Sequence, residues 1–287
     1  MRRSHETHPL GAASARLLGC RPGIPVAGPY MDHEAGFLAA AAAVGTDVLQ
    51  CSLGTAWVGN FLHRRLPPPP GGLNLVLPAP VGQGRLIVRV LPAGNSTLDW
   101  AVSTFAGDRR RAERILAERL LPPAHLVGLP WLTWPNPFGG IGGGGGVLGI
   151  DTHTTREDML RASVAGLCFA FRHVFEPVIA AGRVETVLLT GGASRSASVR
   201  TLLAALLSPL RVCYSPSDEL AGAGGSVWAF QEKAARCPRR MVRPAAGLIG
   251  KAGEAYARFR STCTALAAGL GDAAGLPLAY YRGSSRK

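Results

Sequence analysis

Polar and apolar positions alternate along the second quarter of the chain in the manner of β-strands. A strand shows this pattern when its successive side chains point to opposite faces of a sheet. The predicted strands cover residues 47–53, 56–62, 73–77 and 85–91. Gly54-Thr55 separates the first two, and we therefore expect a hairpin there.

The second half of the chain predicts a regular alternation of strands and helices. Thr154 and Glu157 have the spacing of a capping box, in which a threonine and an acid three residues later satisfy each other's backbone amides. The elements predicted after it are a long helix to about residue 181, a strand at 185–189, a helix at 196–207, a strand at 211–214 and a helix at 219–233. This order is typical of an α/β domain with helices covering a sheet.

The remaining segments give weaker patterns. The predicted elements are helices at 12–18, 35–44, 109–120 and 253–267, and a buried strand at 23–28. A glycine tract at 139–146 is predicted to be a flexible, exposed insertion. That interpretation is favoured over a phosphate-binding loop, because such a loop requires Lys followed by Ser or Thr at its end.

Composition places the chain among folded proteins. Its 287 residues are enough for one large domain or two modest ones, and 47% hydrophobic with 17% charged residues argues against a disordered chain. The six cysteines lie far apart, which argues against a disulfide framework or a zinc site and favours a reducing compartment. No segment predicts a membrane span or a signal peptide, so we expect a soluble, cytoplasmic protein.

The formal net charge of +13 raises the hypothesis of nucleic-acid binding. Only three of the 31 basic residues are lysine, which is typical of a general drift toward arginine. No aromatic residues interleave the clusters 109–111 and 239–240 in the way that single-strand binders require. Nucleic-acid binding is therefore kept as a third hypothesis.

Three short motifs are candidates for chemistry. Gly191-Gly192 ends a buried strand ahead of a helix, a pattern that suits either a nucleotide close to the backbone or simply a tight turn, and spacing leaves both open. Gly54-Thr55 could contact phosphate through amides and a hydroxyl, although an ordinary turn explains it as well. Asp32 precedes an apolar helix, where a carboxylate serves as a helix cap or as a general base.

Taken in order, these motifs resemble the C-terminal part of the FGGY family of carbohydrate kinases. The resemblance begins near residue 17 and continues to the end of the chain. The matching segments are 23–36 (GIPVAGPYMDHEAG), 52–55 (SLGT), 84–100 (GRLIVRVLPAGNSTLDW), 146–172, 191–193 (GGA), 219–229 and 254–260 (EAYARFR). The last of these is similar to the tail helix of pentulose kinases, such as the xylulokinases.

The resemblance implies an actin-like (ribonuclease H-like) α/β lobe with a mixed sheet flanked by helices, followed by a C-terminal helical tail. It implies ATP and Mg²⁺ as cofactors, the metal being held through ATP and not by protein ligands. Asp32 takes the place of the catalytic base that accepts the proton of the attacking sugar hydroxyl. The residues implied to bind the nucleotide are Gly54, Thr55, Gly94, Asp99, Gly191, Gly192, Ala193 and Ser196, the last where some members have an Asn near the adenine.

The sequence also departs from the family. Nothing in residues 1–28 resembles the phosphate loop of the family's first lobe, so we expect that lobe to be missing. The expected parts are a remnant of the first lobe and hinge at 1–45, the nucleotide-binding domain at 46–235 and a basic linker with a tail helix at 236–287. Alone, such a chain should bind nucleotide but turn over little sugar, a ketopentose or polyol, unless a separate N-terminal lobe is supplied. The alternative is a non-catalytic remnant that serves as an interaction module.

Overall fold

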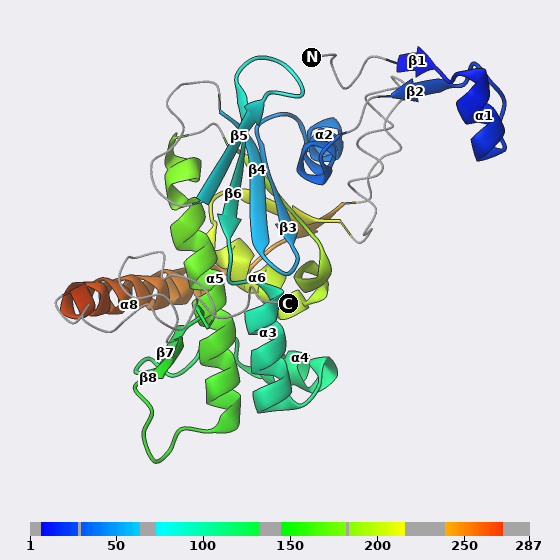
Figure 1. The fold of residues 1–287 in the computed structure, drawn as a ribbon. Coiled ribbons are helices and arrows are strands. Elements are labelled where there is room, and N and C mark those ends of the chain that lie inside the picture. Colours follow the sequence, from blue (N-terminus) through cyan, green and yellow to red (C-terminus); the bar gives the residue numbers. More distant parts are fainter. Residues whose placement is uncertain are drawn as a thin grey trace.

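The computed structural model describes residues 7–27, 30–63, 73–132, 145–181, 184–215 and 239–271. A seven-stranded sheet with the order β11-β10-β9-β3-β4-β6-β5 forms its centre (Figure 1). Its strands are β3 (Val48–Leu53), β4 (Trp57–His63), β5 (Leu73–Pro78), β6 (Arg85–Leu91), β9 (Thr186–Thr190), β10 (Arg211–Tyr214) and β11 (Arg240–Val242).

The sheet is mixed. β9 runs parallel to both β3 and β10, whereas all other neighbouring pairs are antiparallel. Parallel pairing brings the carboxyl ends of β3 and β9 to the same edge, with Ser52 opposite Thr190. The loops that follow these two strands therefore begin side by side.

Helices cover both faces of the sheet. The helices in the described part of the chain are α1 (Ala12–Leu18), α2 (Asp32–Val44), α3 (Asn95–Ala101), α4 (Arg109–Glu118), α5 (Arg156–Ala181), α6 (Ala197–Leu206) and α8 (Ala246–Gly271), with a π-helical turn at Val102–Ala106 and a 3₁₀ turn at Gly192–Arg195. On one face Leu188 packs with Phe37 of α2, and on the other Leu189 packs with the larger core around α5 and α6. Because both faces are covered there, nearly every residue of β3, β4 and β9 is buried.

Two small sheets lie outside the central one. β1 (Thr7–Pro9) pairs with β2 (Pro25–Ala27), and β7 (Val127–Leu129) pairs with β8 (Gly146–Leu148). The second pair includes Gly146, which the sequence placed in an exposed tract. The rest of that tract up to residue 144, and the predicted helix at 219–233, lie outside the described residues.

Several element boundaries differ from the sequence expectations. The capping box at α5 joins Thr155 to Asp158 and not Thr154 to Glu157. The helix at α2 begins at Asp32 instead of residue 35, α8 begins seven residues before the predicted position, and the expected linker contains the edge strand β11. The overlapping Thr-Thr-Arg-Glu-Asp run allows two cap registers, and hydrogen bonds with Arg119 and Arg161 favour Asp158.

One described helix, α5, is long and apolar enough to cross a membrane by length and composition alone. Most of it is buried in the core, as expected for the central helix of a folded domain. The cysteines of the described ranges are all free thiols. Burial raises the pKa of Cys263 to about 12 and also raises the pKa of Cys51, which leaves both thiols protonated and unreactive at neutral pH.

Candidate functional site

Three glycine-containing turns meet at the carboxyl edge of β3 and β9. A Cβ atom added to Gly94 would lie 2.3 Å from the carbonyl oxygen of Thr55. One added to Gly191 would lie 3.0 Å from the Leu53 backbone, and Gly191 also has a φ of +83°. Glycine is therefore required at both positions because the backbones of the turns touch. The structure thus brings Gly54 and Thr55 together with Gly94, Gly191 and Gly192.

Asn95, which the sequence analysis did not single out, fastens these turns to one another. Its backbone amide donates to the Gly54 carbonyl at 3.0 Å, and its side-chain amide donates to the Leu53 carbonyl at 3.1 Å. Its side-chain oxygen accepts a hydrogen bond from the Trp57 indole at 3.2 Å. A polar residue directly after Gly94 at a helix start was the available signal, but its partners lie about 40 residues away.

A series of hydrogen bonds between buried polar side chains supports the turns from within the sheet. Gln50 Nε2 donates to Thr190 Oγ1 at 3.0 Å, and that hydroxyl donates to the Cys51 carbonyl at 3.0 Å. Asn60 donates to Gln50 from the next strand. Because Thr190 directly precedes Gly191, these contacts fix where the Gly191-Gly192 turn leaves the sheet.

The turn after Gly191 is held by local contacts. Ser194 donates through its hydroxyl to the Gly191 carbonyl at 2.7 Å. Arg200 donates to the Ser194 carbonyl at 2.5 Å, and its guanidinium lies 3.9 Å from the ring centroid of Tyr214. Ala193 is buried under this arrangement. Both interpretations of Gly191-Gly192 therefore stay compatible, because the segment is a tight turn that also borders the Gly54-Thr55 hairpin.

Thr55 differs from its neighbours because its side chain is exposed. Among the described residues its hydroxyl has no hydrogen-bond partner. A free hydroxyl at the meeting point of three turns is available to a ligand oxygen.

Ser196 and Asp99 have protein partners of their own. Ser196 caps α6 by accepting from the Val199 amide at 3.1 Å, and its hydroxyl donates to Glu113 of α4 at 2.7 Å. Asp99 lies on α3 and forms an ion pair with Arg109 at 2.6 Å, with both side chains more than half exposed. Glu113 was not identified from the sequence, where it lies inside an arginine-rich helix.

Asp32 is the first residue of α2 and is highly exposed, with 79% of its side-chain surface accessible. Its carboxylate accepts a hydrogen bond from the His33 amide at 2.8 Å. One turn along the helix, Gly36 packs against the Gln50 side chain. Helix α2 thus contacts the polar residues under the turns through Gly36, whereas the described hydrogen bond of Asp32 itself is local and does not reach the turn cluster.

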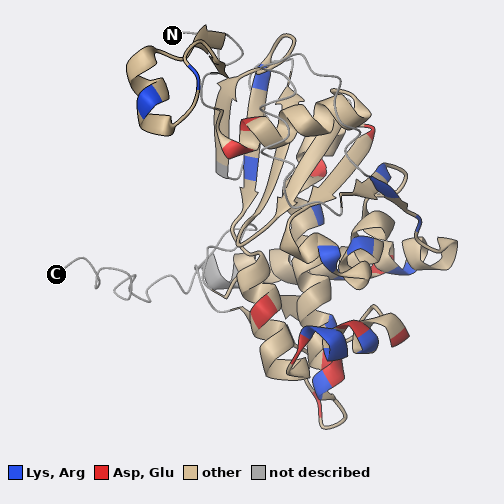
Figure 2. Ribbon diagram, turned by 90° about the vertical axis from the view of Figure 1, so that its right-hand side faces the viewer, with Lys and Arg blue, Asp and Glu red and all other residues tan. Residues whose placement is uncertain are grey.

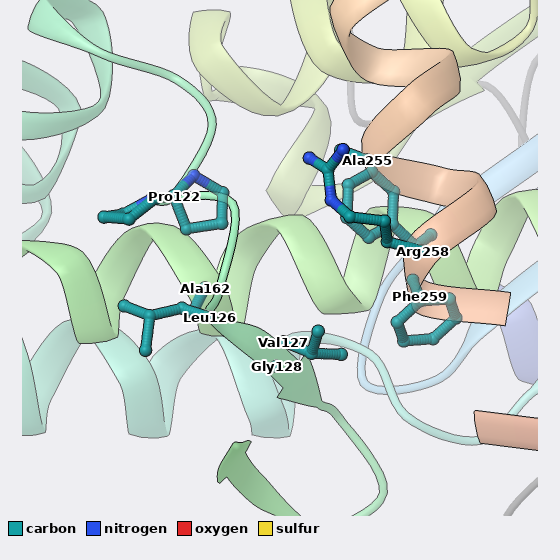
Figure 3. A pocket seen from close by; sticks show the side chains of 10 residues that line it. Pro122, Leu126, Val127, Gly128, Ala162, Ala255, Arg258 and Phe259 are labelled. Atoms are coloured by element: carbon teal, nitrogen blue, oxygen red, sulfur yellow. The ribbon is translucent and has the colours of Figure 1, made fainter. Parts of the chain in front are cut away.

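A small pocket, partly open to solvent, lies elsewhere, where α8 and the segment before β7 pack against α5 (Figure 3). Its lining is largely apolar and includes Leu126, Phe169 and Phe259, with Arg258 at its side. None of the turn residues lines it. It therefore does not belong to the cluster of glycine turns.

Charged residues gather on the helical part of the molecule below the sheet, where basic and acidic residues are intermingled along the ribbon (Figure 2). Arg111 pairs with Glu157 at 3.7 Å, and Arg119 pairs with the buried Asp158. Within the described ranges no group of three or more His, Cys, Asp or Glu side chains has the arrangement of a metal site.

Comparison with known proteins identifies the family. Residues 49–230 match the C-terminal domain of the FGGY family of carbohydrate kinases, which is more than half of the chain. The chain belongs to this family. The sequence resemblance to FGGY kinases is thereby confirmed.

Several solved kinases share the fold. A xyloylose kinase from Brucella ovis has a TM-score of 0.78 and 21% identity over 93% of this chain and 57% of its own. A xylulose kinase from Rhodospirillum rubrum has a TM-score of 0.76 and 20% identity, and the match covers 94% of this chain and 57% of that kinase. A gluconate kinase from Lactobacillus acidophilus has a TM-score of 0.78 and 16% identity, and the match covers 94% of this chain and 58% of that kinase.

These similarities confirm the predicted actin-like α/β lobe with a mixed sheet flanked by helices. The FGGY chain spans little more than half the length of the solved kinases that it matches. A sequence search of curated proteins finds no significant match.

Proposed function

We propose that this FGGY chain provides the ATP-binding part of a cytoplasmic sugar kinase, which transfers the γ-phosphoryl group of ATP to a hydroxyl of a ketopentose or related polyol. The observation that carries the proposal is the meeting of the Gly54-Thr55, Gly94-Asn95 and Gly191-Gly192 turns in a chain of this family. Backbone amides and a free hydroxyl at such turns suit phosphate oxygens.

The proposed roles follow from the surroundings of each turn. Thr55 and the amides of its turn hold the phosphates, and the Gly191–Ser196 segment takes the adenosine. Mg²⁺ would enter together with ATP and would supply positive charge that offsets the negative charge developing during transfer. Asp99 is proposed at the border of the site. Because its ion pair with Arg109 is exposed to solvent, the Asp99 carboxylate can leave Arg109 and contact a ligand instead.

Asp32 is proposed as the general base. The sugar hydroxyl oxygen attacks the γ-phosphorus while the bond to the β–γ bridging oxygen breaks, and Asp32 accepts the hydroxyl proton. Because the carboxylate is exposed, we expect a sugar-binding wall beyond the described residues to enclose it. We therefore propose that activity is weak or absent until a separate N-terminal lobe is supplied, with residues 1–45 forming the junction and residues 236–287 the tail.

The test is sugar-dependent formation of ADP. It is measured with a panel of ketopentoses and polyols, with the chain alone and with the first half of a xylulose kinase added in trans. Asp32→Asn should lower the rate by about 100-fold or more, the usual contribution of a general base. Glu34→Gln, an acid-to-amide change on the same helical turn, should leave most of the rate.

Two results would count against these assignments. Equal rates for Asp32→Asn and the unmodified chain in an active mixture would remove Asp32 from the mechanism. ADP formation that no sugar stimulates in either arm would contradict the kinase assignment.

A further inference from the structure

The carboxylate of Glu113 connects α4 to the start of α6. One of its oxygens accepts the Ser196 hydroxyl at 2.7 Å. The other accepts both the backbone amide and the hydroxyl of Ser198, at 2.7 and 2.9 Å. Glu113 thus takes three hydrogen bonds from residues more than 80 positions away, and it occupies the N-terminus of α6 with an internal negative charge.

These bonds determine what the Ser196 hydroxyl can still do. A serine hydroxyl has one proton to donate and two lone pairs to accept with. The proton is donated to Glu113, and one lone pair receives the amide of Val199 at 3.1 Å. One lone pair is left, so Ser196 can accept one further hydrogen bond but cannot donate one.

The Glu113 carboxylate is itself an acceptor only, and the two residues together present acceptors at the end of the Gly191–Ser196 segment. We propose that Glu113 sets the hydrogen-bond polarity of Ser196 and thereby makes this site select a nucleobase with a 6-amino group over one with a 6-oxo group. The inference rests on the proposed function, in which this segment takes the adenosine. The 6-amino group of adenine donates to the remaining lone pair, whereas a 6-oxo group would place its own lone pairs against it.

The isosteric change Glu113→Gln should reverse this polarity. The amide and hydroxyl of Ser198 both require an acceptor, so the glutamine oxygen stays with Ser198 and its NH₂ group turns toward Ser196. Both lone pairs of the Ser196 oxygen are then occupied, by the glutamine NH₂ and by the Val199 amide. The Ser196 proton becomes free to donate to a 6-oxo group.

The experiment compares dissociation constants of Mg²⁺ complexes of ADP, IDP and the diphosphate of purine riboside, which lacks only the 6-amino group of adenosine. The full chain should bind ADP about three- to tenfold more tightly than either analogue, the value of one hydrogen bond. Glu113→Gln should bind IDP more tightly than ADP. Ser198→Ala is the matched control, because it removes one partner of Glu113 but leaves Ser196 untouched, and it should keep the preference for ADP.

The possible outcomes distinguish failure of the Glu113 inference from failure of the proposed nucleotide site. ADP binding by the full chain with no preference over purine riboside diphosphate would overturn the inference without any variant, even if Glu113→Gln did not fold. An unchanged preference in folded Glu113→Gln would overturn it as well. Absence of binding for every diphosphate at millimolar concentration would instead remove the proposed nucleotide site, and the inference with it.

Discussion

At the start of α5, the buried carboxylate of Asp158 collects hydrogen bonds from several directions. Burial alone would raise the pKa of Asp158, but the hydroxyl and amide of Thr155 and the charges of Arg119 and Arg161 outweigh it, and the pKa is lowered. Arg161 is itself buried and also donates to carbonyls of the α4 region. This cluster joins α4 to α5.

A lowered pKa means that Asp158 stabilises the fold while it is ionised. Its contribution is present above the unfolded value of about 4 and is lost as the pH falls from there toward the folded value. Thr155→Val removes the hydroxyl that stabilises the ionised carboxylate and should weaken this contribution. The free energy of unfolding should then decrease less steeply as the pH falls from about 5 to about 2. Urea unfolding across that range measures the effect.

The matched control for this prediction is Thr152→Val, the same change at an exposed threonine nearby. It should leave the pH dependence as it is. Identical pH profiles for Thr155→Val and the unmodified chain would contradict the role given to the Thr155 hydroxyl.

The glycines of the candidate site could be found from the sequence, but their polar partners could not. A glycine at a strand end marks a turn wherever it occurs, so Gly54 and Gly191 stand out locally. Asn95 and Glu113 gain their roles from partners about 40 and 80 residues away, so their positions at a helix start and in an arginine-rich helix do not show which groups they bind. Their roles depend on how the elements pack.

At the scale of elements, α8 is fixed to the domain largely by aromatic packing. Phe259 is 1% exposed, and its ring lies 5.5 Å from that of Phe169 and 6.1 Å from that of Trp131. Tyr256 donates to Glu176 of α5 at 2.9 Å. Burial and the neighbouring Glu176 charge raise the pKa of Tyr256, which keeps this donor protonated.

Removal of the Phe259 ring should therefore loosen α8. We expect Phe259→Ala to lower the free energy of unfolding by about 3–5 kcal/mol, as for other buried aromatic residues. Lys251→Ala on the exposed side of the same helix should change it by less than about 0.5 kcal/mol. Denaturant unfolding measures both, and a loss under 1 kcal/mol for Phe259→Ala would show that α8 is not part of the cooperative core.

Elements with strong periodicity were predicted well, and short edge elements were not. The four strands at 47–91 and the long helix α5 were expected from apolar positions that recur with a regular period over several residues, and the structure has strands and a helix at these places. β11 has three residues and two of its side chains are exposed, so no apolar pattern marks it. Its pairing with β10 comes from tertiary contact alone.

For the whole molecule, the central sheet takes its strands from two of the three parts expected from the sequence, and the first part packs a helix against it. α2 packs against β3, and β11 extends the sheet at β10. In the region around α4, Arg109, Arg111 and Arg119 form ion pairs with acidic side chains, which interrupt the positive charge there. This arrangement favours nucleotide binding at the three turns over nucleic-acid binding on a continuous basic surface.

The most direct test of this account maps MgATP binding on the full chain by amide NMR shifts or hydrogen exchange. The account predicts changes centred on Gly54-Thr55, Gly94-Asn95 and Gly191-Gly192. It also predicts that Thr55→Ala, which removes one hydrogen bond to a charged phosphate, weakens binding about tenfold or more, while the exposed control Thr152→Ala does not. Changes confined to the pocket beside Phe259 or to the arginines of α4, or none at millimolar MgATP, would contradict it.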